Sequence, residues 1–212
     1  MAFGKLWTIA YRDLGRNRRR SALSLIAVAL GLGLLILGSG YIAGALEGSL
    51  QNNILMQTGH VQVRAESYEI ENMSLLWSDL LENIDDLTLN IQQMEEVESA
   101  TPVLWASGIL STVHDSSGLR VLGVDVDASY HDPVRQGMTA GEYLTTEDRD
   151  GVLISKRLAD SMGIAVGQKV SLVVGNPEGK PDEGIFTIRG LYATGIASYD
   201  DNTLLMPISK AQ

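Results

Sequence analysis

The 212-residue sequence contains no cysteine, so neither a disulfide bond nor thiol chemistry can support its fold or its function. Its three histidines, His60, His114 and His131, lie far apart and lack the spacing of metal ligands. Each is therefore expected to be structural or at the surface rather than catalytic. There is also no G-x-S-x-G nucleophile motif. The sequence predicts no catalytic site and no cofactor.

Acidic clusters are the remaining candidates for a cation site. Asp125-x-Asp127 lacks the glycine and the distal glutamate of a calcium-binding loop. The run Asp200-Asp201-Asn202 offers oxygen ligands, but a solvated turn is the favoured interpretation. No metal site is predicted from either cluster.

Basic residues become scarce after residue 20. The chain has 16 Lys and Arg and 26 Asp and Glu. Residues 1–20 contain six of the basic residues and one acidic residue, so the rest of the chain contains ten basic and 25 acidic residues. The arginines before the first long apolar run could contact nucleic acid, but their position favours anionic lipid headgroups, so no nucleic-acid partner is predicted. These membrane-interface arginines are Arg16, Arg18, Arg19 and Arg20.

Residues 21–46 form 26 consecutive positions without a charge. As a helix this run would be about 39 Å long, against a hydrocarbon core of about 30 Å, so it predicts a transmembrane helix. The positive flank places the N-terminus in the cytoplasm and the acidic remainder outside. Two alternatives stay open: a signal peptide cleaved near Ala43-Gly44-Ala45, and a buried helix of a soluble core. The run is longer than is usual for either.

Residues 1–20 are predicted to form an amphipathic cytoplasmic leader, with Trp7 at headgroup level as an interface anchor. The alternative is a polar start to one continuous helix. Within the span, Gly40, Gly44 and Gly48 form a double GxxxG ridge and predict a helix-packing face. The alternative is that glycine is simply frequent in membrane helices.

The outer part, residues 47–212, is predicted to have an α+β fold of two lobes. Residues 47–135 show a strand at 59–64, a helix around 79–94 and a hairpin about the turn at 115–118, which is a βαββ order. Residues 136–207 look β-rich, with a strand and helix closed by Gly163 and strands near 168–175, 184–195 and 202–209, the last stopped by Pro207. Residues 208–212 are expected to begin the return to the first lobe.

Five segments together resemble the permease subunits of MacB/FtsX-type ABC transporters, including the LolC and LolE lipoprotein-releasing permeases. They are YRDLGRNRRRSALSLIAVALG, TGHVQV, SGLRVLGVD, DGVLISKRLADSMGIAVGQKVSLVV and IRGLYATGIASYDDNTLLMPISKAQ. No segment is specific alone, but their order and spacing cover nearly the whole chain. TGHVQVRAESY is closer to the lipoprotein-release branch than to the macrolide-export branch.

The resemblance implies four spans and an outer domain with a Porter-like α+β lobe and an inserted β-rich Sabre-like lobe. It implies two permease chains, identical or different, in the bacterial inner (plasma) membrane, each coupled to a cytoplasmic ABC ATPase that hydrolyses ATP. Motion of the spans would then extract or export a lipoprotein or amphipathic substrate by mechanotransmission, without hydrolysis by this chain. Leu37, Tyr41 and Leu46 would line the cavity where acyl chains and membrane lipids enter.

The resemblance also implies segments that follow Gln212, namely the rest of the Porter-like lobe, three further spans and a coupling helix. The sequence is therefore expected to be the N-terminal portion of such a permease. Two other functions stay open: a single-span protein with an outer sensing or binding domain, and a secreted enzyme released by cleavage after Ala45.

Overall fold

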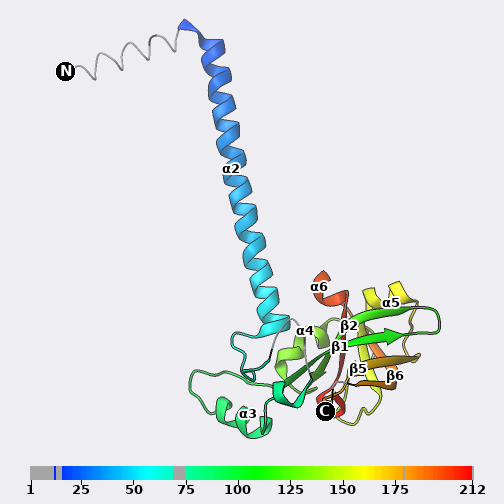
Figure 1. Ribbon diagram of the computed structural model, residues 1–212. Coiled ribbons are helices and arrows are strands. Elements are labelled where there is room, and N and C mark those ends of the chain that lie inside the picture. Colours follow the sequence, from blue (N-terminus) through cyan, green and yellow to red (C-terminus); the bar gives the residue numbers. More distant parts are fainter. Residues whose placement is uncertain (1–11, 13–15, 69–74, 179, 212) are drawn as a thin grey trace. The chain divides into compact units, whose positions relative to one another are not determined.

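The computed structural model describes residues 12, 16–68, 75–178 and 180–211 (Figure 1). The chain divides into two compact units, residues 1–51 and 52–212. The first holds a long apolar helix and the second is a β-rich domain with short helices. The predicted α+β class is therefore confirmed.

The apolar helix α2 (Arg18–Asn53) is followed directly by a π-helical turn, η1 (Ile54–Thr58). Apolar side chains surround α2 on all sides, and Leu37, Tyr41 and Leu46 are 71%, 79% and 60% exposed. A helix that is apolar all round is suited to a hydrophobic surrounding rather than to water. Within the described residues, segment 18–58 is the one helix long and apolar enough to cross a membrane. The predicted span at 21–46 lies inside it.

A seven-stranded sheet in the order β3-β6-β4-β7-β2-β1-β5 forms the second unit. Residues 181–187 of β6 pair with β5 and residues 187–192 pair with β4, so the sheet closes into a ring to which β3 is added. The β2–β7 and β4–β6 pairs are parallel. The strands are β1 (Val103–Ser111), β2 (Ser116–Val124), β3 (Met138–Gly141), β4 (Gly151–Ser155), β5 (Lys169–Gly175), β6 (Pro181–Tyr192) and β7 (Thr203–Pro207).

Two buried clusters lie on opposite faces of this sheet, because alternate strand residues point to opposite sides. In β7, Leu204 and Met206 belong to the inner cluster, which fills the ring, whereas Leu205 belongs to the outer cluster. Three helical turns cover the outer face of β2, β7 and β4: η1, α4 (Asp132–Gln136) and α6 (Ala197–Asp200). The outer cluster comprises Met56, Leu122, Val124, Val126, Val134, Leu144, Leu153, Tyr192, Tyr199 and Leu205.

The predicted strand–helix unit ending at Gly163 is confirmed. Helix α5 (Lys156–Met162) begins where the Ser155 hydroxyl accepts the Leu158 N–H at 2.9 Å, which is a standard N-cap. It ends at Gly163 with φ +64°, the left-handed conformation that glycine adopts freely. The predicted hairpin is also present, as β1 and β2. The remaining short helices are η2 (Trp77–Asp79), α3 (Ile84–Gln92), η3 (Ser129–His131) and α7 (Ile208–Ala211).

The strand predicted at residues 59–64 is wrong, and with it the βαββ order. These residues are described but belong to no strand, and Val61 and Val63 are 84% and 53% exposed. Alternation predicts a strand only where a neighbouring strand and a core are available to it, and none of the described strands pairs with this segment. The helix predicted from 79 to 94 is shorter than expected, because Asn83 takes a left-handed conformation (φ +51°) and α3 begins only at Ile84.

The division at residue 135 into an α+β lobe and a β-rich lobe stays a prediction. Strands β1 and β2 precede that boundary and β4 to β7 follow it, yet all of them pair in one sheet. Residues 208–211 form α7, which contacts β2 and β7, and their role as the start of a return to the first lobe stays a prediction.

Candidate coupling site

Arg120 joins three segments of the second unit. It is the one charged residue of β2, and in the parallel register it lies opposite Thr203 of β7. Its Nη1 donates to the Gln57 side-chain oxygen of η1 at 3.1 Å. Its Nη2 donates to the Ser198 carbonyl of α6 at 3.1 Å and to Asn202 Oδ1 at 3.2 Å. One planar guanidinium thus connects the segment that follows α2 to α6 and to the turn after it.

Neutral acceptors surround the Arg120 guanidinium in the described part of the chain. Its carbon lies 5.8 Å from the centre of the Trp105 ring, within cation–π range. Its Nε is buried and has no hydrogen-bond partner among the described residues. Burial lowers the pKa of Arg120, and the neighbouring Tyr199 and Tyr192 oppose that shift. A guanidinium remains charged at physiological pH, so Arg120 acts as a fixed clamp and not as a proton donor.

The outer cluster holds η1 against the sheet. Met56 of η1 is 5% exposed and lies in the same buried cluster as Tyr199 of α6. Segment η3 also contacts η1, and within η3 the rings of Tyr130 and His131 meet edge to face with centroids 5.1 Å apart. A displacement of η1 would therefore disturb a packed core rather than slide over a free surface.

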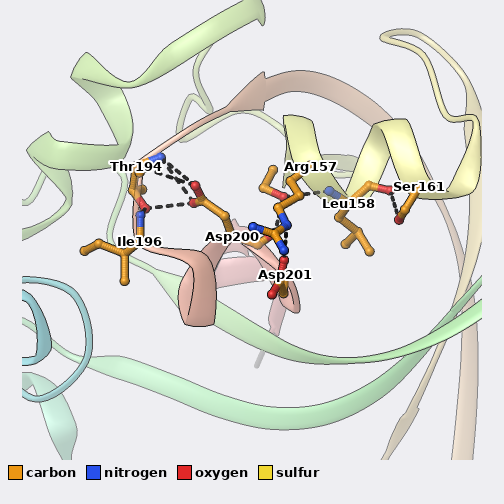
Figure 2. A network of polar contacts seen from close by, with 9 residues as sticks. Arg157, Leu158, Ser161, Thr194, Ile196, Asp200 and Asp201 are labelled. Carbon is orange, nitrogen blue, oxygen red and sulfur yellow. Dashed lines mark hydrogen bonds and ion pairs between the residues drawn. The ribbon is translucent and has the colours of Figure 1, made fainter. Parts of the chain in front are cut away.

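The end of α6 is held by a carboxylate (Figure 2). Asp200 Oδ1 accepts the Thr194 hydroxyl at 2.7 Å, and Asp200 Oδ2 accepts the Gly195 N–H at 3.1 Å. The Thr194 N–H also lies 3.1 Å from both carboxylate oxygens. Hydrogen bonds to an ionised acceptor are the stronger kind, so this contact fixes α6 to the loop before it.

Two contacts then tie α6 to α5. The Ser155 hydroxyl donates to the Asp200 carbonyl while accepting from the first turn of α5. On the exposed side Arg157 and Asp201 form an ion pair (Figure 2), with Arg157 Nε 2.5 Å from Asp201 Oδ1. The named contacts form one series, from Gln57 through Arg120 to α6, and from α6 to α5. We call this series the coupling site.

The predicted site residues of the first unit are not part of the coupling site. At Gly40, Gly44 and Gly48 a Cβ would meet nothing within 4 Å, so this face of α2 is open and its packing partner stays a prediction. The cavity role of Leu37, Tyr41 and Leu46 likewise stays a prediction. The arginines at 16, 18, 19 and 20 are exposed, whereas Trp7 and the other residues at 1–11 and 13–15 of the predicted leader fall outside the described residues.

The titratable residues singled out in the sequence differ in their surroundings. His60 and His114 are exposed, whereas His131 is 3% exposed and is a buried structural residue. The solvated turn predicted at 200–202 is wrong for Asp200, which is 6% exposed, because its carboxylate receives the donors of Thr194 and Gly195.

Sequence reasoning missed Arg120, Gln57 and Met56. For Arg120 a signal was present, since a single cation between the apolar residues of LRVLGV needs a polar partner once the strand is buried. For Gln57 and Met56 no local pattern exists, because their role depends on where η1 meets the sheet.

Comparison with known proteins places the chain in a family. The model of the MacB-like periplasmic core domain family matches residues 21–212. No curated protein matches the chain. Among solved structures, the crystal structure of the extracellular domain of the noncanonic ABC-type transporter YknZ from Gram-positive bacteria is similar, with 16% sequence identity and a TM-score of 0.43. That match covers 59% of this chain and 62% of the YknZ chain, which is less than two thirds of its length.

Proposed function

We propose a function on the premise that the chain belongs to the family of MacB-like periplasmic core domains, whose model covers residues 21–212. On this premise the chain provides the first span and the outer domain of a permease subunit of an ATP-driven ABC transporter. The proposal rests on one observation: η1 follows α2 without a break in the chain, and η1 is bound to the outer domain through buried Met56 and through the hydrogen bond from Arg120 to Gln57. A span that ends in a packed domain can transmit motion to it.

The remaining parts of the proposal follow from the same premise. A cytoplasmic ABC ATPase subunit supplies ATP hydrolysis, and a second permease subunit, identical or different, completes the complex. Neither this chain's chemistry nor a cofactor drives the cycle. The outer domain lies on the periplasmic or extracellular side of the plasma membrane. The substrate class is a lipidated or amphipathic molecule that enters beside Leu37, Tyr41 and Leu46 of α2, which present apolar side chains outward.

The test is to purify the native protein from its own membranes, reconstitute it in nanodiscs, and measure both its intact mass and the ATP turnover that accompanies it. We expect a polypeptide well above the 22.9 kDa of this sequence, and vanadate-sensitive turnover that a synthetic diacylated peptide stimulates. A chain near 22.9 kDa without ATP turnover would support the alternative, a single-span protein with an outer sensing or binding domain.

A further inference from the structure

We infer that Arg120 is a positioning residue that makes α6 a relay, so that a displacement of η1 is passed to the first turn of α5. The inference deepens the proposed function, on which it rests for the source of the displacement, namely motion of α2. The relay itself is a property of contacts within the second unit.

The first step is the link between η1 and α6. Arg120 uses its two terminal nitrogens in different directions, Nη1 toward Gln57 and Nη2 toward Ser198 and Asn202. A guanidinium is planar and rigid, so its two ends move together. Its buried Nε lacks a hydrogen-bond partner in the described chain, and Nη2 already contacts Ser198, Asn202 and Thr203, so Gln57 is the one acceptor of Nη1 among the described residues. A shift of Gln57 should therefore draw the guanidinium with it, because a buried unpaired donor is unfavourable.

In the second step, helix α6 moves as one rigid unit. Helix α6 has four residues, too few for stability of its own, so its position depends on the groups that hold it. Arg120 holds the carbonyl of Ser198, and Tyr199 is buried in the outer cluster to which Met56 also belongs. A force on either Arg120 or Met56 thus acts on the same short helix.

The third step leads from α6 to α5. The Asp200 carbonyl accepts the hydroxyl of Ser155, and that hydroxyl also caps α5 by accepting the Leu158 N–H. If α6 moves, Ser155 must give up one of these two contacts or move with it. The face of α5 that responds is open to solvent, since the side chains of Arg157 and Lys156 are 64% and 54% exposed. The first turn of α5 is therefore the end of the relay.

The relay can be tested by hydrogen–deuterium exchange on the full chain in nanodiscs. Gln57→Ala and Arg120→Lys should each raise exchange of residues 156–158 and 197–201 about tenfold, which corresponds to about 1.4 kcal/mol of lost local stability. Exchange in β5, residues 169–175, should not change. Gln92→Ala is the matched control, because Gln92 is exposed and its side chain donates to the Ala100 backbone carbonyl, which is not part of the coupling site.

A double variant sharpens the test. Gln57→Ala combined with Arg120→Lys should raise α5 exchange no further than Arg120→Lys alone, since both break the same link. Unchanged exchange in α5, additive effects, or an equal rise in β5 would each overturn the relay. None of these outcomes depends on ATP or on substrate, so the relay can fail while the proposed transporter function stands.

Discussion

His131 shows how burial changes the chemistry of a single residue. Its side chain is 3% exposed, and burial lowers its pKa from 6.5 to about 4. The nearby Arg135 lowers the pKa further, whereas Asp125 and Asp132 oppose the shift. The imidazole is therefore neutral in the folded protein throughout the physiological range, although its Nε2 has no hydrogen-bond partner among the described residues.

Acid should therefore destabilise the outer domain through His131. The folded pKa of about 4 lies below the unfolded value of 6.5, so the unfolded chain binds the proton first. The contribution of neutral His131 to the free energy of unfolding is fully present above pH 6.5 and is lost as the pH falls through about 4. The total loss is about 3 kcal/mol. Urea denaturation of His131→Phe between pH 7 and 4 should show a shallower loss than the unsubstituted chain. The exposed His114→Gln should behave like the unsubstituted chain, and parallel curves for all three would contradict the prediction.

Two glycines with positive φ should respond differently to alanine. At Gly141, φ is +75° and a Cβ would lie 2.3 Å from the Arg189 carbonyl oxygen and 2.7 Å from Gly190 Cα. At Gly163, φ is +64° but a Cβ would meet nothing within 4 Å. We expect Gly141→Ala to lower the free energy of unfolding by about 3 kcal/mol, from conformation and clash together, and Gly163→Ala by about 1 kcal/mol. Urea midpoints would measure both, and equal losses would mean that the backbone at 141 relaxes.

At the scale of elements, local signals predicted local structure. The segment 151–163 carries its own strand pattern, a serine N-cap and a terminal glycine, and β4 and α5 form as expected. The segment 59–64 has an equally regular alternation but forms no strand, because pairing depends on a neighbour that sequence pattern does not identify. The meeting of Gln57, Arg120 and Ser198 lies beyond such local signals, since the three residues come from η1, β2 and α6, which are far apart in the sequence.

Helix α6 gives a prediction at this scale. Asp200→Asn should place an amide group against the Thr194 and Gly195 donors and remove the charge, lowering the free energy of unfolding by about 2 kcal/mol. Asp201→Asn removes the ion pair with Arg157, in which the side chains of Asp201 and Arg157 are 46% and 64% exposed. This substitution should change the free energy of unfolding by less than about 1 kcal/mol. Chemical denaturation of the full chain in detergent compares the two, and equal effects would count against Asp200 as the residue that fixes α6.

At the scale of the whole molecule, charge is divided unequally along the chain. Six basic residues and one acidic residue lie within residues 1–20, against ten basic and 25 acidic in the remainder. Positively charged flanks of a span stay in the cytoplasm, so this asymmetry favours an outer position for the sheet domain. The asymmetry and the span could be predicted from composition alone. The closed sheet could not, because it depends on β6 pairing with β5 and β4 along its two halves.

The absence of cysteine makes this orientation directly testable. Val113 lies in the turn between β1 and β2 and is 93% exposed, and Asn17 is exposed just before α2. A membrane-impermeant maleimide added to intact spheroplasts should label Val113→Cys at once and Asn17→Cys only after the membrane is permeabilised. The reverse pattern would place the sheet domain in the cytoplasm. If the chain is instead cleaved after Ala45, the mature Asn17→Cys protein would take no label even after permeabilisation, and α2 would be a signal sequence rather than a span.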